Sequence, residues 1–261
     1  MSKYGYEEAF SAEFYDPVTS KRLHDVKFWL DYAQKAGDRT LELACGTGRV
    51  LFPLAQAGIT ITGLDYSVYM LNICRQKLAQ QPQDIQARVR IIQANMANFQ
   101  TSEQYSLIIV PGRSFQILIT PAEQESCLHS IAGHLKSHGT LIIDVFHPDF
   151  PRLYDPKYLQ EFDRTSGVKL ADGRTVDVAS RIVAYHKDMQ YNEVEEIYYV
   201  HHKDGRDERL VQSFPFHYFF RYEMEHLLRL CGFKVIDLFG NFDKSPFTNE
   251  SREMIFVAEK A

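Results

Sequence analysis

A short apolar run that leads into two closely spaced glycines constrains the fold of this chain more than any other feature. Residues 40–49 read Thr-Leu-Glu-Leu-Ala-Cys-Gly-Thr-Gly-Arg, and Gly46 and Gly48 allow a turn that larger side chains would block. Leu51 and Leu54 follow at helical spacing. The pattern predicts a strand, a tight turn and a helix, a geometry that lets a cofactor approach the backbone near a helix N-terminus.

Two acidic residues narrow the class of cofactor. Residues 59–64 predict a second strand, and Asp65 follows them about 20 residues after the glycines, where such sheets hold a ribose hydroxyl pair. The dinucleotide fingerprint G-x-G-x-x-G is incomplete, because Leu51 stands at its third glycine. Glu42, inside the first strand, would repel a diphosphate but not a cationic cofactor. A nicotinamide-dependent oxidoreductase is therefore the less favoured reading.

The stretch resembles motif I of the class I S-adenosylmethionine-dependent methyltransferases, E/D-x-G-x-G-x-G. Glu42, Gly46 and Gly48 match it, and Ala44 replaces the first glycine. The resemblance implies an α/β fold, with a Rossmann-like, doubly wound, seven-stranded and mostly parallel sheet and an inserted antiparallel β cap. Its seventh strand would lie antiparallel between the fifth and the sixth. The resemblance extends to small-molecule enzymes of the glycine and amino-sugar N-methylating kind.

The regular alternation of helices and strands stops near residue 150. Residues 176–186, 191–202 and 208–220 predict three long antiparallel strands, and Asp204-Gly205 marks a hairpin turn. The last strand is apolar on both faces, so it needs cover from the main domain, a second subunit or a substrate. The predicted divisions are an N-terminal arm with lid helices (residues 1–37), a Rossmann-like domain (residues 38–150 and 221–261) and an inserted antiparallel subdomain (residues 151–220).

Several capping signals predict where helices begin and end. An aromatic arm that includes Tyr4, Tyr6, Phe10 and Phe14 would form a helix that ends at Pro17. Ser20 would cap a second helix with Leu23 on its buried face. Further on, Ser67 and Thr120 would begin two more helices, and Gly139 would end the later one.

The resemblance and the strand ends together give the candidate site residues. Those expected to contact S-adenosylmethionine are Glu42, Ala44, Cys45, Gly46, Gly48, Asp65, Tyr66, Met70, Asn95, Met96 and Pro111. In the resembling family, an amide or acid at the position of Asn95 bonds the adenine amino group, with an apolar neighbour such as Met96 against the ring. The candidate substrate residues are Arg113, Ser114 and Arg221.

The candidate catalytic residues are His147, Tyr15 and Asp144. Methyl transfer depends mainly on holding the nucleophile in line and excluding water. Tyr15 or Phe115 could place an aromatic face near the sulfonium charge. An amine needs little help from a base, whereas a hydroxyl would need His147, His134 or Asp144. Asp144 could equally be a hydrogen-bonded structural acid, and a helix-dipole contact is favoured for His134. The choice between an amine and a hydroxyl stays open.

Composition limits the partners. The net charge is −5 and the pI is about 6.1, which argues against nucleic acid. No run of about 18 apolar residues predicts a membrane span, and the histidines and cysteines lack metal-ligand spacing. The four scattered cysteines suggest free thiols in the cytoplasm. We expect a small-molecule substrate and a homodimer through the inserted strands. A protein that binds S-adenosylmethionine without catalysis is the alternative from another class.

Overall fold

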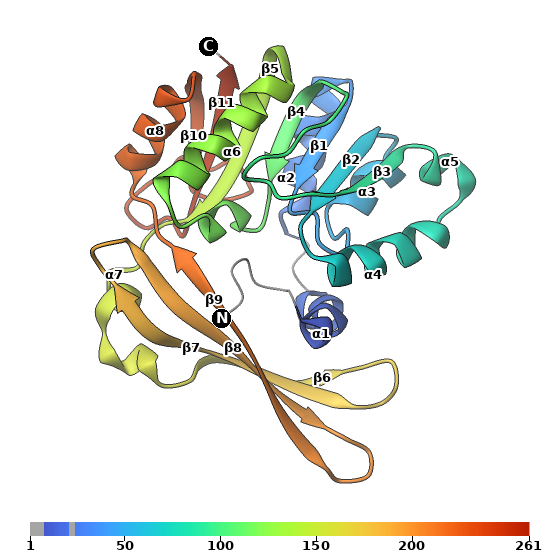
Figure 1. The fold of residues 1–261 in the computed structure, drawn as a ribbon, viewed down its shortest axis with the longest axis vertical. Helices are drawn as coiled ribbons and strands as arrows, with labels where there is room; N and C mark the ends of the chain where they lie inside the picture. Colours follow the sequence, from blue (N-terminus) through green and yellow to red (C-terminus); the bar gives the residue numbers. More distant parts are fainter. Residues whose placement is uncertain (1–7, 21–23, 261) are drawn as a thin grey trace.

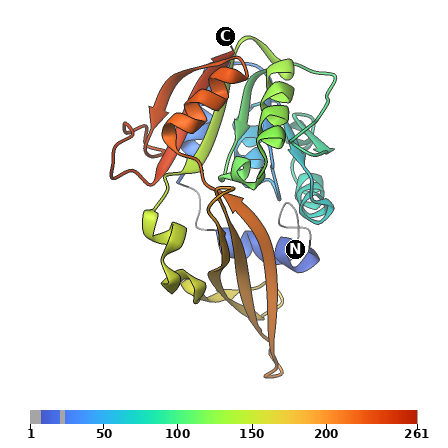
Figure 2. The same ribbon diagram turned by 60° about the vertical axis from the view of Figure 1, so that its left-hand side comes forward.

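The computed structural model describes residues 8–20 and 24–260, so Tyr4, Tyr6 and Leu23 lie outside the described residues. The chain forms a seven-stranded sheet with helices on both faces and a separate four-stranded antiparallel sheet (Figure 1). The antiparallel sheet lies beyond one edge of the larger sheet rather than on either of its faces (Figure 2).

The larger sheet has the strand order β10-β11-β5-β4-β1-β2-β3. Strand β11 runs antiparallel between β5 and β10, which confirms the topology that the resemblance implied. The other contacts, β5–β4–β1–β2–β3, are all parallel. The strands are β1 (Thr40–Leu43), β2 (Ile61–Asp65), β3 (Val89–Gln93), β4 (Tyr105–Val110), β5 (Leu135–Phe146), β10 (Phe233–Phe239) and β11 (Glu253–Lys260).

Helices cover both faces of this sheet, as a doubly wound fold requires (Figure 1). Strand β4 is buried on both faces, because Leu107 and Ile109 pack in one apolar cluster and Ile108 and Val110 pack in the other. A parallel strand buried on both faces reads as a continuous apolar run. One cluster includes α2 (Val26–Ala36), α3 (Leu51–Gln56) and α4 (Val68–Ala79); the other includes α6 (Pro121–His134) and α8 (Arg221–Leu230). The short α5 (Gln83–Gln86) and the 3₁₀ turn η1 (Ser114–Ile117) lie in connections.

The antiparallel sheet confirms the three long strands that alternation predicted. They are β7 (Thr175–His186), β8 (Tyr191–His201) and β9 (Asp207–His217), with the hairpin turn at Asp204-Gly205. A fourth strand, β6 (Phe162–Lys169), pairs with β7 and was not predicted. Its residues are mostly polar and exposed, and its pairing register shifts twice, so it lacks the apolar period of a buried strand. The segment before it holds α7 (Phe150–Tyr154) and η2 (Pro156–Leu159).

The N-terminal helix α1 (Ala9–Thr19) connects the two sheets (Figure 1). Phe14 packs among the apolar residues of β7 and β8. On its other side, Asp16 accepts hydrogen bonds from Lys77 Nζ of α4 at 2.8 Å and from Thr47 Oγ1 of the glycine turn at 2.5 Å. Helix α1 therefore holds the antiparallel sheet against the region of the glycine turn.

Three predicted helix boundaries were wrong. Pro17 was expected to end α1 but lies inside it. Two side-chain hydroxyls donate hydrogen bonds to carbonyl oxygens near the end of this helix: Thr19 Oγ1 to Tyr15 O, and Ser20 Oγ to Pro17 O. Ser20 is thus the C-cap of α1, and α2 begins after Asp25. Helix α6 ends at His134, before Gly139, because Leu135 already pairs with Tyr105 of β4. The capping residues Ser67 and Thr120 are confirmed.

Candidate active site

A cavity of about 1150 Å³ lies between the carboxyl edge of the parallel strands and the antiparallel sheet. Its floor is formed by the ends of β1, β2, β4 and β5. Its roof is formed by residues of β7, β8 and β9, namely Ser180, Ile182, Asn192, Val194, Glu196, Phe214 and Phe216. A site for one ligand usually measures about 300–1,000 Å³. This cavity therefore has room for a cofactor and a second molecule.

The glycine turn forms one end of the cavity. Gly46 has a φ of 55° and donates its backbone N–H to Asp65 Oδ2 at 2.8 Å. Asp65 Oδ1 accepts from the N–H of Ser67 at 2.8 Å, so this side chain joins the end of β2 to the turn. A Cβ atom on Gly46 would lie 3.2 Å from Cε of Met70, which also lines the cavity. Burial raises the pKa of Asp65, against the effect of its backbone donors.

The other small residues of the turn have different roles. Ala44 lines the cavity with a φ of 55°, a left-handed conformation that costs a non-glycine residue about 1–2 kcal/mol. Gly48 has a φ of 88° and does not line the cavity, which corrects the prediction that it contacts the cofactor. A Cβ atom there would lie 2.4 Å from the ring of Phe52. Gly48 therefore shapes the turn by letting α3 pack close to it.

An acid and an ion pair lie beside this turn. Glu42 is only 2% exposed, and its Oε2 has no hydrogen-bond partner within the described part of the chain. Burial raises the pKa of Glu42 well above its usual value. Next to it, Arg49 forms two hydrogen bonds with the carboxylate of Asp25, at 2.6 and 2.7 Å. Both partners line the cavity but were not predicted as site residues. The sequence places Arg49 directly after Gly48, and that position could have indicated a role in the site. No sequence pattern pointed to Asp25.

The predicted adenine contacts also face this end. Asn95, Met96 and Tyr66 line the cavity after β3 and β2, and Cys45 and Pro111 line it after β1 and β4. Asn95 Oδ1 accepts a hydrogen bond from the N–H of Ala97 at 2.9 Å, which fixes the orientation of its amide. An amide that is oriented in this way can donate from its nitrogen to a ligand.

The part of the cavity beside β5 is acidic and aromatic. Asp144, in β5, accepts the backbone N–H of Arg113 through Oδ2 at 3.0 Å, and the guanidinium group of Arg113 pairs with Glu253 of β11. Burial, and then the charge of Glu253, raise the pKa of Asp144 to about 7, whereas Arg113 lowers it. Phe146 stacks on Phe216 of the roof with ring centroids 5.7 Å apart.

Comparison with known proteins identifies a domain in the first half of the chain. Residues 40–139, which contain the glycine turn and both acids, match the methyltransferase domain family. This part of the chain is a methyltransferase domain, set in the fold of the class I S-adenosylmethionine-dependent enzymes.

Similar proteins span the whole length of this methyltransferase. It is 24% identical to the cypemycin N-terminal methyltransferase of a Streptomyces species, over 98% of this chain and 97% of that protein. The CcbJ methyltransferase of Streptomyces caelestis has a similar structure, with a TM-score of 0.77, 22% identity and full coverage of both chains. CalS10, an amino pentose methyltransferase from Micromonospora echinaspora, superimposes with a TM-score of 0.71 and 21% identity, over 95% of this chain and 96% of its own. The two structural likenesses confirm the fold.

The candidate acceptor residues of the methyltransferase divide between the cavity and the surface. Tyr15, Arg113, Ser114, Asp144 and His147 all line the cavity. His147 Nδ1 donates a hydrogen bond to the carbonyl oxygen of Ser251 at 2.8 Å. Two other candidates lie elsewhere. Arg221 begins α8 outside the cavity, where it pairs with Glu225 at 2.9 Å, and Phe115 is fully buried against Phe219. Neither is placed to contact the acceptor.

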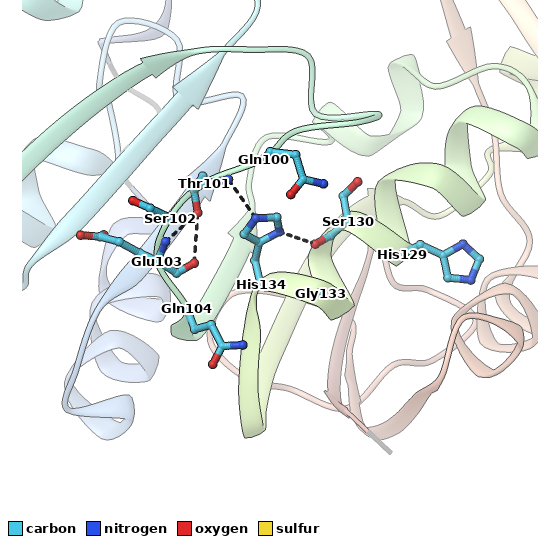
Figure 3. Close-up of a pocket in the computed structure, with 9 residues that line it drawn as sticks. All are labelled: Gln100, Thr101, Ser102, Glu103, Gln104, His129, Ser130, Gly133 and His134. Carbon is cyan, nitrogen blue, oxygen red and sulfur yellow. Dashed lines mark hydrogen bonds between the residues drawn. The ribbon is translucent and has the colours of Figure 1, made fainter.

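His134, the outlying catalytic candidate, lies at the opposite edge of the methyltransferase sheet. It contributes to a separate pocket of about 280 Å³ (Figure 3). Its Nδ1 donates to the carbonyl oxygen of Ser130 at 2.7 Å, and its Nε2 accepts from the N–H of Thr101 at 2.9 Å. Both ring nitrogens are therefore used in joining the end of α6 to the loop before β4. The structure thus assigns His134 a structural role.

Three further properties concern metals, thiols and membranes. Among residues 8–20 and 24–260, no group of three or more His, Cys, Asp or Glu side chains is placed to hold a metal ion. The four cysteines are free thiols, and all of them are buried. No helix within the described residues is long and apolar enough to cross a membrane.

Proposed function

We propose that this methyltransferase methylates an amine of a small molecule. The observation that carries the proposal is the chemistry of the cavity wall beside β5 and β11, which Asp144, Glu253, Phe146 and Phe216 all line. Carboxylates attract an ammonium group, and aromatic faces also favour cations. Arg113 lies among these carboxylates, but its guanidinium group is already paired with Glu253. A protonated amine suits this wall better than a neutral hydroxyl.

The names of similar proteins support an amine acceptor. The cypemycin enzyme is named as an N-terminal methyltransferase, and CalS10 as an amino pentose methyltransferase. Both names refer to a molecule that offers an amino group, although one is a peptide and the other a sugar. The cavity of about 1150 Å³ could admit either a small molecule or the end of a peptide. The amine is the feature that the two acceptors share.

The residues around the glycine turn fit S-adenosylmethionine. The space in front of Gly46 would be reduced by any Cβ atom. Burial disfavours the ionised form of Glu42, whose Oε2 is unpartnered, and a cationic ligand would compensate for that cost. We assign Asp65 to the ribose hydroxyls, Asn95 and Met96 to the adenine, and Glu42 to the charged end of the cofactor. Bound S-adenosylmethionine supplies a methyl group on a positively charged sulfur.

The contribution of the chain is to position the amine and to exclude water. Tyr15, on α1, and His147, just after β5, line the cavity from opposite elements, so we propose that they orient the acceptor. The roof strands and α1 cover the cavity, which would keep bulk water from the reacting groups. A protein that only bound the cofactor would have no need of the additional volume beyond the glycine turn.

A screen for S-adenosylhomocysteine production tests the proposal. Purified protein would be incubated with S-adenosylmethionine and a panel of aliphatic amines, amino sugars and short peptides, each paired with the matching hydroxyl compound. We expect turnover with at least one amine and none with its hydroxyl partner. Turnover only with hydroxyl compounds would contradict the proposal, and cofactor binding without turnover on any compound would favour the non-catalytic alternative. The Gly46→Val variant serves as the background control.

Two other expectations concern assembly and location. We propose a homodimer through residues 151–220 and a cytoplasmic location. Light scattering coupled to gel filtration tests the first, because a monomeric mass would reject it. Fractionation of the cells that express the protein tests the second.

A further inference from the structure

Asp144 uses one carboxylate oxygen and leaves the other without a partner. Its Oδ2 accepts the backbone N–H of Arg113 at 3.0 Å, whereas Oδ1 has no hydrogen-bond partner in the described part of the chain. The residue is 2% exposed, yet it lines the cavity. A buried polar atom without a partner costs about 1–3 kcal/mol. Its position suggests that Oδ1 meets a donor on a bound molecule.

The charges around Asp144 leave it poorly compensated. From the turn after β4, Arg113 faces it, but the guanidinium group of that residue is already paired with Glu253 of β11. From the segment before α2, Asp25 adds a further negative charge and is itself paired with Arg49. Burial and Glu253 therefore outweigh Arg113, and the pKa of Asp144 rises to about 7. A carboxyl group in this range can both accept and release a proton near neutral pH.

We propose that Asp144 accepts a proton from the ammonium group of the acceptor. This inference rests on the proposed amine methylation. An aliphatic amine is protonated at neutral pH, since the lysine amine has a pKa of about 10.4, and a protonated nitrogen has no lone pair to react. The ammonium N–H donates to Oδ1 of Asp144. Its N–H bond then breaks, the electron pair remains on nitrogen, and the proton passes to Oδ1. Asp144 becomes a neutral acid and later returns the proton to water.

Arg113 and Glu253 act as positioning residues in this step. Arg113 has a left-handed backbone conformation, with a φ of 62°. In this conformation, the backbone N–H of Arg113 donates to Oδ2 of Asp144. Glu253 anchors the side chain of Arg113 through its guanidinium group. Together they hold the carboxylate so that Oδ2 is occupied and Oδ1 remains for the acceptor.

The sign of the pH dependence follows from the raised pKa. The reaction needs the carboxylate, so kcat/KM should rise with pH through about 7 and then level off. Stability has the opposite trend. Between pH 3.8, the usual pKa of an aspartate, and about 7, the folded chain retains a proton that the unfolded chain has lost. The contribution of Asp144 to stability therefore falls as pH rises through this window and stays low above it.

The Asp144→Asn variant tests both trends, with Asp188→Asn, in the exposed turn after β7, as the matched control. Asparagine keeps an oxygen for the Arg113 N–H but cannot accept the proton. We expect the melting temperature of Asp144→Asn, compared with that of the wild type, to be raised more at about pH 8 than at about pH 5. We also expect kcat on an amine found in the screen to fall at least about 100-fold, with the affinity for S-adenosylmethionine unchanged. The control should match wild type in every measurement.

A second variant, Glu253→Gln, keeps the proposal testable if Asp144→Asn does not fold. Removing that negative charge should lower the pKa of Asp144, so the rise of kcat/KM should move to lower pH. Near-normal turnover by Asp144→Asn, no extra thermal gain at the higher pH, or an unmoved profile in Glu253→Gln would each overturn the inference. The two failures are distinguishable: a wild-type protein inactive on every amine rejects the proposed function, whereas an active wild type with an equally active Asp144→Asn rejects only the role of Asp144.

Discussion

The two ends of the cavity are built in different ways. The cofactor end comes almost entirely from residues 42–96, where three neighbouring parallel strands finish, and backbone N–H groups hold its key carboxylate, Asp65. The acceptor end draws on residues far apart in the chain, and side chains hold it together: Arg113 with Glu253, and Phe146 with Phe216. A local backbone design suits a cofactor shared by a large family, whereas side chains from many segments can change with the acceptor.

This difference predicts which measurement each substitution affects. Changes at the cofactor end should weaken the binding of S-adenosylmethionine. Changes at the acceptor end should lower turnover and leave that binding intact.

The largest effect is expected for Gly46→Val. A β-branched residue at a φ of 55° is strained, and its Cβ would lie 3.2 Å from Cε of Met70, at the place that we assign to the cofactor. Calorimetry should detect no binding of S-adenosylmethionine. Gly58→Val is the control, because Gly58 has a φ of 94° and nothing within 4 Å of its Cβ position. That variant should lose stability but keep its affinity; normal binding by Gly46→Val would place the cofactor elsewhere.

Asp65→Ala should weaken the binding of S-adenosylmethionine by more than about 1.5 kcal/mol, the scale of a hydrogen bond to a charged group. Part of this loss would come from the turn, since Asp65 also accepts the N–H groups of Gly46 and Ser67. Asp65→Asn can still accept one of these bonds, so it should bind with an intermediate affinity. An unchanged affinity in a folded Asp65→Ala protein would remove this residue from the site.

His147→Ala should lower turnover and leave cofactor affinity almost unchanged. The imidazole donates to the carbonyl of Ser251 and packs edge-on against Phe247, so its loss would disturb the acceptor wall rather than the glycine turn. Steady-state kinetics with a methylated amine, together with calorimetry, separate the two quantities. His129→Ala, an exposed change on α6, should leave both as in wild type. A parallel loss of turnover and affinity would instead mark His147 as structural.

The smallest effect is expected for Ala44→Gly. Ala44 has a φ of 55°, so glycine should relieve about 1–2 kcal/mol of strain. Its greater freedom in the unfolded chain offsets about 0.5–1 kcal/mol of that gain. The free energy of unfolding, measured with urea, should therefore rise by up to about 1.5 kcal/mol. Ala33→Gly, inside α2, is the opposite control and should lower it. A fall with Ala44→Gly would show that the alanine side chain stabilises the turn by packing.

The same comparison explains what the sequence could predict. The spacing of Glu42, Gly46 and Asp65 is local, so it predicted the strands, the turn and the cofactor family correctly. The apolar run of β4 and the long alternating strands of the insertion were also predicted correctly from their residue patterns. The acceptor wall was harder to predict from the sequence, because Arg113 pairs with Glu253, which lies 140 residues away.

The errors have different causes. Arg221 was expected near the acceptor, but it begins α8 on the surface and pairs with Glu225 within its own helix. Asp25 carried no sequence signal, because only the fold brings it to Arg49. Strand β6 was missed because its pairing with β7 is irregular and its side chains are mostly exposed. The contact between Asp25 and Arg49 joins separate segments, which periodicity and capping do not encode.

A crystal structure with S-adenosylhomocysteine would show where the cofactor and the acceptor lie in the cavity. We predict that the ribose hydroxyls contact Asp65, that the adenine lies beside Asn95 and Met96, and that the sulfur faces the wall formed by Asp144, His147 and Phe216. A ligand bound away from the glycine turn, or a sulfur that pointed away from that wall, would contradict this placement of the cofactor and the acceptor.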